Sequence, residues 1–220
     1  MSWLRLLTCA VIGYLLGNFQ TGVVVGRLLA RKDLRMHGSG SSGATNAMRV
    51  LGKKAGILTL LGDIAKGMLA VELGILILGR DGGLTAGLFV VIGHIWPAFF
   101  GFNGGKGIAT TLGVLLILQP LYAANIFVVT VILICATRIV SLSDLIGTGI
   151  YLLLNTITAV MIQDWILLCF GLLLAFLIIF AHRGNIQRLN RGTEAKFNFP
   201  TFGERTTALV LKFLRFHWIR

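Results

Sequence analysis

The sequence is poor in charged residues, and especially in acidic ones. Only 13% of its 220 residues are charged, whereas a soluble domain is about a quarter charged, so an ordinary soluble domain is excluded. The 20 Lys and Arg outnumber the 8 Asp and Glu, for a formal net charge of +12. In a soluble chain this excess would suggest nucleic-acid binding, but in a membrane chain it is typical of loops retained on the cytoplasmic side. We therefore expect no nucleic-acid partner.

Cysteine is scarce as well. The three cysteines, Cys9, Cys135 and Cys169, lie in apolar runs and show neither Cys-x-x-Cys spacing nor a neighbouring cluster of His and Cys. This pattern indicates neither a disulfide framework nor a zinc site. Four other ionisable residues also lack the spacing of metal ligands: Asp63, Glu72, His94 and Asp144. We expect no metal and no cofactor.

Apolar residues, in contrast, are abundant. They make up 56% of the chain, which has a mean hydropathy of +0.87, and they fall in runs such as "IFVVTVILICA". Each run can be extended towards the ~20 residues that cross a bilayer as a helix. The sequence therefore predicts an all-α integral membrane protein. About seven transmembrane helices are expected, at residues 3–29, 57–79, 84–100, 107–119, 121–138, 144–163 and 165–182.

The basic residues predict the orientation of these spans. Residues 30–56 hold six Lys and Arg and the tail from residue 183 holds eight, whereas the opposite side offers only Arg5 and Arg80. Because Lys and Arg are enriched in cytoplasmic loops, we expect the N-terminus outside and the C-terminus inside. This placement requires an odd number of spans, and five spans would also satisfy it.

The chain shows no internal repeat and no linker, so residues 1–196 are expected to form a single polytopic membrane domain. Residues 197–220 form a basic C-terminal extension in which apolar residues alternate with Lys212, Arg215 and Arg220. This pattern suits an amphipathic helix on an anionic inner leaflet. A solvated tail is the alternative.

The stretch "GSGSSGATNAMR", from Gly38 to Arg49, begins with the dinucleotide-binding pattern G-x-G-x-x-G. That pattern requires a preceding strand, but "RKDLRMH" is basic and polar, and the acidic residue expected about 20 positions later, Asp63, lies in a membrane helix. The dinucleotide interpretation therefore fails. Glycines that let backbone N–H groups approach an anion, with hydroxyls and an Arg, favour a phosphate loop. A flexible polar loop is the alternative.

Two further segments carry comparable chemistry. In "FGFNGGKGIATTLGV" the spacing excludes a Walker A loop, but glycines around Lys106, just before an apolar helix, suit an anion at a helix N-terminus. In "AHRGNIQRL", His182, Asn185 and Arg188 follow at i, i+3 and i+6 along one side of a helix, although the arginines of this segment could be interfacial anchors. All three segments lie on the expected cytoplasmic side, which indicates a site for an anionic substrate.

Ionisable residues also occur inside the expected spans, where they are costly. Asp63 and Lys66 are i, i+3 neighbours, and we interpret them as an ion pair that supports the site from within. His94 is expected to be buried and hydrogen-bonded.

Four segments, "GSGSSGATNAMRVLGKKAG", "DIAKG", "GHIWPAFFGFNGGKGIATTLGV" and "HRGNIQRLNRGTE", resemble the bacterial acyl-phosphate:glycerol-3-phosphate acyltransferase family (PlsY type) in order and spacing, over about residues 10–196. The resemblance implies a seven-helix enzyme of the bacterial cytoplasmic (inner) membrane, with its active site facing the cytoplasm. It implies acyl transfer from acyl phosphate to the sn-1 hydroxyl of glycerol 3-phosphate, giving lysophosphatidate and phosphate for phospholipid biosynthesis. The implied partners are these two substrates and membrane lipids, and no obligate protein partner is evident.

The resemblance also implies roles for individual residues. The catalytic residues would be Ser39, Arg49, Lys106, His182 and Asn185. The residues that bind substrate phosphate would be Gly38, Gly40, Gly43, Thr45, Asn46, Gly104, Gly105 and Gly107. Structural support would come from Asp63, Lys66 and Glu194. The chain departs from the family pattern at Ser41, where Asn is usual, and at Asn103, where Lys is frequent.

The chemistry fits these residues. An acyl phosphate has a good leaving group, so positioning and charge stabilisation are the enzyme's main tasks. Ser39 has no sequence-adjacent base, and we interpret it as a phosphate ligand rather than a nucleophile. A transporter of organic anions is the main alternative, but the anion motifs cluster on one face and no duplicated half is present. An inactive lipid-binding protein is disfavoured by the intact set of catalytic residues.

Overall fold

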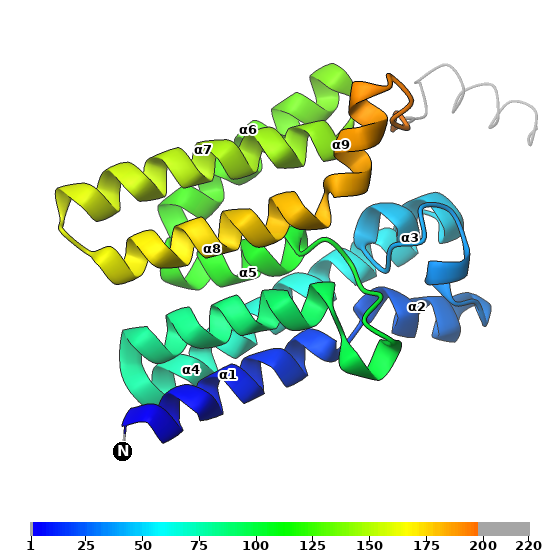
Figure 1. The fold of residues 1–220 in the computed structure, drawn as a ribbon. Coiled ribbons are helices and arrows are strands. Elements are labelled where there is room, and N and C mark those ends of the chain that lie inside the picture. Colours follow the sequence, from blue (N-terminus) through cyan, green and yellow to red (C-terminus); the bar gives the residue numbers. More distant parts are fainter. Residues whose placement is uncertain (1, 198–220) are drawn as a thin grey trace, which may run out of the picture.

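The computed structural model describes residues 2–197, and over this range all regular structure is helical (Figure 1). The expected extension from residue 197 lies, beyond Phe197 itself, outside the described residues. The longer helices are α1 (Ser2–Asn18), α4 (Lys53–Ile95), α6 (Pro120–Thr137), α7 (Val140–Met161) and α8 (Trp165–Ala181). The shorter ones are α2 (Thr21–Ala30), η1 (Leu34–Met36), α3 (Ala44–Leu51), η2 (Ala98–Phe100), α5 (Ile108–Leu118) and α9 (Arg183–Asn190).

The 43-residue helix α4 reverses direction within its length. Leu78 and Gly79 have non-helical backbone angles, and Gly79 has a positive φ of 58°, which glycine adopts readily. The two legs then pack together: a Cβ at Gly82 would lie 2.1 Å from the carbonyl oxygen of Gly74. The expected spans 57–79 and 84–100 are therefore the two legs of one helical hairpin. The second leg ends at Ile95 rather than at residue 100, because Pro97 cannot continue a helix.

Four helices of the described region are long and apolar enough to cross a membrane, and a fifth is counted if α8 and α9, bent by 58°, form one span. In that count α1 and α2 form one span, as do α4 and η2. The expected span at 107–119 is the 11-residue helix α5, which is about 16 Å long and so shorter than the ~30 Å hydrocarbon core. A multi-pass arrangement is clear, whereas a count of seven spans stays a prediction.

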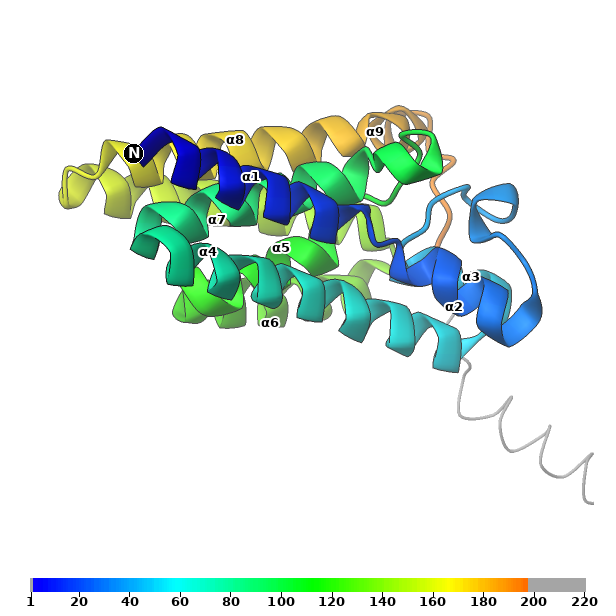
Figure 2. The same ribbon diagram turned by 90° about the horizontal axis from the view of Figure 1, so that it is seen from below.

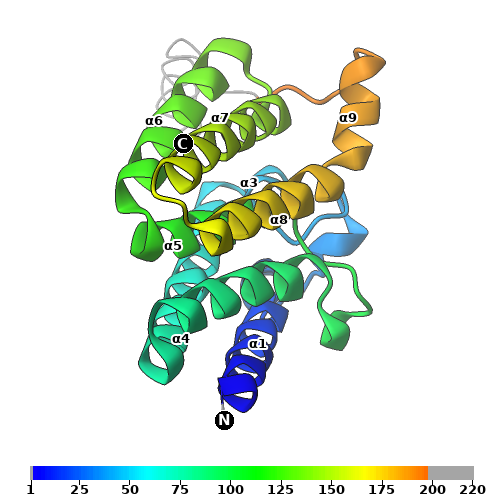
Figure 3. The same ribbon diagram turned by 60° about the vertical axis from the view of Figure 1, so that its left-hand side comes forward.

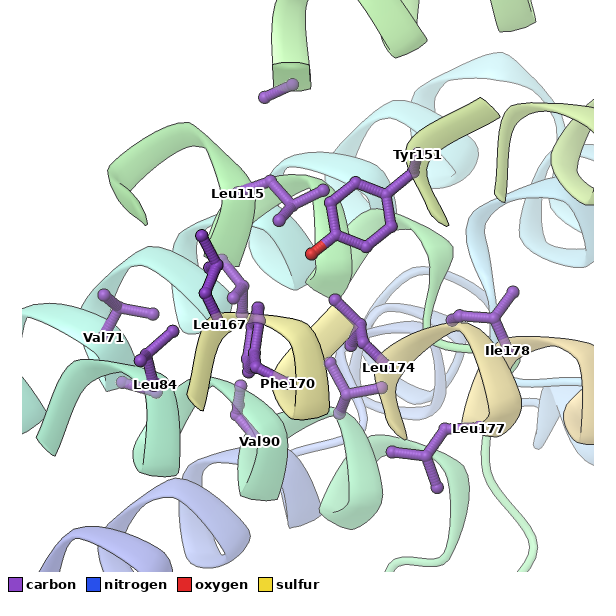
Figure 4. Packing of buried hydrophobic residues seen from close by; sticks show 14 of the residues in the cluster. Val71, Leu84, Val90, Leu115, Tyr151, Leu167, Phe170, Leu174, Leu177 and Ile178 are labelled. Atoms are coloured by element: carbon purple, nitrogen blue, oxygen red, sulfur yellow. The ribbon is translucent and has the colours of Figure 1, made fainter. Parts of the chain in front are cut away.

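The core lies where α8 packs between α7 and α4 (Figure 3). Phe170, Leu174 and Ile178 of α8 lie in one buried cluster with Val90 of α4 and Tyr151 of α7 (Figure 4). The outer surface of the bundle is apolar too, with Trp3, Leu121 and Phe176 among its exposed side chains. Apolar residues both inside and outside are what a helix bundle in lipid requires, because lipid solvates the outer face.

Candidate functional site

The three motif segments meet at one end of the bundle. Figures 1 and 2 place α3, α9 and the loop after η2 at the end opposite the N-terminus. The first and second loops touch, since Ser42 N donates to the carbonyl oxygen of Gly104 at 3.5 Å. Arg35 of η1 joins the segments that precede the two loops: its Nη1 donates to the carbonyl oxygen of Phe100 in η2 at 2.6 Å, and its guanidinium lies 5.4 Å from the centre of the Phe100 ring.

The first loop, residues 38–43, is shaped by the buried amide of Asn46. Asn46 Nδ2 donates to three backbone carbonyls, those of Leu34 (3.0 Å), His37 (3.0 Å) and Ser41 (2.8 Å). Its Oδ1 accepts from Ser39 N at 2.9 Å. Gly38 has a φ of 62°, and a Cβ there would lie 2.2 Å from Asn46 Oδ1, so this position requires glycine. The loop is therefore held in shape by a side chain of α3, the helix that follows it.

The side chains of the first motif are open to a ligand. Ser39 and Arg49 are exposed, and the hydroxyls of Ser39 and Thr45 make no hydrogen bond within residues 2–197. No side chain caps the N-terminus of α3, so its first backbone N–H groups are available. Ser41, one of the two departures from the family pattern, serves the turn itself, because its Oγ accepts from Gly43 N at 3.2 Å.

The second loop, residues 104–107, precedes α5. Gly107 has a φ of 86° and stands at the N-terminus of α5 without a side-chain cap. Lys106 is half-buried between the loops and the bundle. Burial lowers the pKa of Lys106, and the charges of Arg188 and Arg49 lower it further. The carboxylates of Asp144 and Glu194 raise it in part. Charges from the first motif, Arg49, and from the third, Arg188 and Glu194, therefore act on the Lys106 ammonium.

The third segment lies at the bend between α8 and α9, and Glu194 holds it in place. Glu194 Oε1 accepts from Asn185 Nδ2 at 2.5 Å and from Ser141 Oγ at 2.7 Å, and its Oε2 pairs with Arg188 Nε at 2.7 Å. Burial alone would raise the pKa of Glu194, but these three hydrogen bonds and the Arg188 charge bring it below its usual value. An ionised Glu194 therefore ties α9 to the start of α7.

His182 is buried at the same bend. Its Nδ1 lies 2.8 Å from the carbonyl oxygen of Ile178, which can only accept, so Nδ1 carries a proton. Its Nε2 is buried without a hydrogen-bond partner and lies 3.6 Å from Asp144 Oδ2. The Nε2 lone pair and the Asp144 carboxylate can each accept a hydrogen bond from a donor that reaches this point.

Sequence reasoning missed Asp144 as a site residue. Among residues 2–197, Asp144 is the carboxylate that lies 3.6 Å from His182 Nε2 and also acts electrostatically on Lys106. The available signal was its place as a lone acid in an apolar span, where ionisable groups usually face the interior. Ser42 was expected only as one of the hydroxyls of the first motif, and no signal marked Arg35, because the roles of both residues depend on contacts between segments distant in sequence. No three His, Cys, Asp or Glu of residues 2–197 lie close enough together to hold a metal ion.

An apolar cavity begins at Asp144 and runs into the bundle. It has a volume of about 90 Å³, opens partly to the outside, and is bounded by α5, α6, α7 and α8. Its walls are mainly apolar and include Leu112, Phe127, Tyr151 and Leu174. The apolar cavity thus adjoins the end of the bundle that holds the three motifs, since Ile108, two residues after Lys106, lies in its wall.

Comparison with known proteins identifies the relatives of this chain. The family model described as glycerol-3-phosphate acyltransferase matches residues 7–192. The glycerol-3-phosphate acyltransferase of Alkaliphilus metalliredigens is 44% identical over 191 residues, covering 87% of this chain and 95% of the relative. That of Bacillus subtilis is 43% identical over 186 residues, covering 84% and 94%.

Two crystal structures of PlsY, an integral membrane glycerol 3-phosphate acyltransferase, are also similar. The glycerol 3-phosphate form matches with a TM-score of 0.81 and 37% identity, covering 88% of this chain and 96% of that one. The lysophosphatidic acid form matches with a TM-score of 0.79 and 35% identity, covering 88% and 95%.

Proposed function

The chain belongs to the glycerol-3-phosphate acyltransferase family, and from this premise we propose how its site performs the reaction. It is a multi-pass integral membrane enzyme that acylates glycerol 3-phosphate to lysophosphatidate. The observation that carries the proposed site is that the charges of Arg49 and Arg188 act on Lys106, two residues before Ile108 in the wall of an apolar cavity that Asp144 also lines. Cations beside an apolar space match a substrate with a phosphate head and an acyl chain.

The proposed donor is an acyl phosphate, and the acceptor is the sn-1 hydroxyl of glycerol 3-phosphate. The hydroxyl oxygen bonds to the acyl carbonyl carbon, the bond from that carbon to the phosphate oxygen breaks, and the hydroxyl proton passes to the departing phosphate. Two phosphate groups repel each other, so the main contribution of the protein is to hold both close together. No acyl-enzyme is required.

Each site residue then has a task. Ser39, Arg49 and the N-terminus of α3 bind one phosphate, and Lys106 with the N-terminus of α5 binds the other. His182 and Asn185 orient the acceptor, and the cavity among α5 to α8 holds the acyl chain. For Asn46 the proposed task is to shape the phosphate loop, because its amide is already occupied by loop contacts.

We also propose that α5 and both legs of α4 count as membrane segments, which gives seven, with the N-terminus outside and the site facing the cytoplasm. Single cysteines placed beside Arg5 and beside Lys53, in a variant lacking the native cysteines, test this orientation in sealed spheroplasts. An impermeant thiol reagent should label the first site and spare the second. The reverse labelling would contradict the proposed orientation.

The reaction is tested with the purified enzyme, palmitoyl phosphate and glycerol 3-phosphate, following phosphate release and lysophosphatidate together. Ser39→Ala and Lys106→Ala should abolish both signals, while Lys53→Ala, an exposed lysine outside the site, should retain them. Turnover with acyl-CoA but not with palmitoyl phosphate would overturn the proposed donor. Glycerol 3-phosphate uptake by proteoliposomes without acylation would favour the transporter.

A further inference from the structure

A buried polar cluster lies beneath the candidate site and takes no part in the proposed reaction. Asp63 and Lys66 on the first leg of α4 meet His94 on the second leg, and the three residues are only 1%, 5% and 3% exposed. Lys66 Nζ lies 2.9 Å from Asp63 Oδ1 and 2.7 Å from His94 Nδ1. Charges buried in a membrane bundle are costly and seldom serve packing alone.

Lys66 determines which nitrogen of His94 carries the proton. An ammonium group can only donate, so His94 Nδ1 must accept through its lone pair. The hydrogen-bond partners therefore assign the proton of the neutral imidazole to Nε2. Lys66 also donates to the carbonyl oxygen of Phe19 at 2.7 Å, and Thr21 Oγ1 donates to Asp63 at 2.9 Å. The ion pair thus fixes both the ring of His94 and the break between α1 and α2.

His94 in turn contacts the second phosphate loop at two points. Its carbonyl oxygen accepts from Gly105 N at 3.1 Å. Its ring occupies the space where a side chain of Gly105 would stand, since a Cβ there would lie 2.1 Å from His94 Nε2. A Cβ at Gly104 would likewise lie 2.0 Å from the His94 carbonyl oxygen. Gly104 and Gly105 therefore rest directly on His94, one residue before Lys106.

Gln20 connects the same point to the first loop. Its Nε2 donates to the His94 carbonyl oxygen at 3.2 Å, and its Oε1 accepts from Ser42 Oγ at 2.6 Å. Both Gln20 and Ser42 are fully buried. The His94 carbonyl is therefore shared by the Gly105 amide of the second loop and by the glutamine that holds the first.

We propose that His94 is a positioning residue that fixes where the Gly104–Lys106 loop lies on the bundle. The Asp63–Lys66 pair holds the ring of His94, and Gln20 couples this loop to Ser42. The proposal rests on the proposed function, because it assigns the second loop to phosphate binding. Its consequence is kinetic: disturbing the network misplaces Lys106 and weakens glycerol 3-phosphate binding. A purely structural role would reduce the folded fraction, which lowers the maximal rate but leaves the KM of the remaining enzyme unchanged.

The test is a double-mutant cycle of Gly105→Ala and His94→Ala in the purified full-length enzyme, with KM for glycerol 3-phosphate as the readout. Gly105→Ala should raise this KM about tenfold or more in the wild-type background, the effect of about one lost positioning interaction. In the His94→Ala background the added methyl group enters the vacated space, so the same change should alter KM less than about threefold. Equal effects in both backgrounds would overturn the proposal.

A milder variant keeps the proposal testable if the alanine variants do not fold. Gln20→Glu retains an acceptor for Ser42 but replaces the donor to the His94 carbonyl, and it should raise the KM for glycerol 3-phosphate about tenfold. Gln163→Glu, at an exposed position at the far end of the bundle, is the matched control and should leave KM unchanged. An unchanged KM in Gln20→Glu overturns the network alone, whereas a wild-type enzyme without lysophosphatidate formation overturns the proposed function and this inference together.

Discussion

Replacing Asn46 with alanine should disable the first phosphate loop without unfolding the bundle. The substitution removes a side chain of α3 that contacts three carbonyls and Ser39 N in and beside residues 38–43. An amide has two N–H donors, so the three carbonyls share them, and about three full hydrogen bonds are lost. At a net value of about 1 kcal/mol each, the ordered loop loses about 3 kcal/mol.

This loss is local, because the loop packs on α3 and η1 rather than in the main core. About 3 kcal/mol corresponds to a roughly hundredfold lower population of the ordered loop, and kcat/KM for glycerol 3-phosphate should fall by about that factor. The midpoint of thermal unfolding in detergent should change little. Asn125→Ala is the matched control, since that exposed amide donates only to Leu121 of its own helix.

Two outcomes would refute this reasoning. If Asn46→Ala keeps kcat/KM within about threefold of wild type, the loop does not depend on the amide. If Asn125→Ala loses as much activity, the effect reports general destabilisation. Asn46→Asp refines the test: it keeps an acceptor for Ser39 N but turns lone pairs towards the carbonyls, so it should be at least as damaging as alanine.

Three further predictions follow from the site. Asp144 favours the charged form of Lys106 against the effect of burial, so Asp144→Asn should lower the pKa of Lys106 further and move the alkaline limb of the kcat/KM pH profile to lower pH. An unmoved limb would show that Asp144 has no electrostatic effect on Lys106. Because the pKa of Glu194 is below its ordinary value of 4.5, its ionised form stabilises the fold at neutral pH, and this stability should be lost as pH falls from 4.5 through the folded-state pKa. Scanning calorimetry of unfolding should show this loss in the wild type and not in Glu194→Gln. Ala123→Phe should fill the inner part of the cavity and lower the kcat/KM ratio of palmitoyl to decanoyl phosphate about tenfold or more, since about two methylenes lose their contacts.

The parts of the fold that depend on long apolar runs could be predicted from the sequence. The expected spans 121–138 and 165–182 agree with α6 and α8 within a residue at each end, and 144–163 with α7 within a few residues. The short span expected at 107–119 also agrees with α5 within a residue at each end, and the expected end of a span at residue 79 falls at the reversal of α4. Hydropathy did not show that the expected span 3–29 is broken between α1 and α2, because both helices are apolar.

The candidate site also has a part that the sequence predicts and a part that it does not. Glycines and cations in short loops indicate anion chemistry by composition alone, so the three motif segments were identifiable before their contacts were known. The carboxylate of Asp144 and the amide of Gln20 were not, because their importance arises from partners 38 and 22 residues away in sequence, His182 and Ser42. Local patterns carry chemistry, whereas tertiary packing decides which polar groups share a space.

The glycines of the two phosphate loops illustrate this division. Gly40 has a φ of 74°, and a Cβ there would meet nothing closer than 3.6 Å, so its requirement is one of backbone conformation. Gly105 has no positive φ, and its requirement is the space taken by the His94 ring. Asparagine tolerates the left-handed region better than alanine does, so it suits the first position better. At Gly105 the smaller alanine is the lesser disturbance. Glycine therefore meets different requirements in the two motifs: at Gly40 it allows the backbone conformation of the loop, and at Gly105 it leaves space for the buried network beneath the loop.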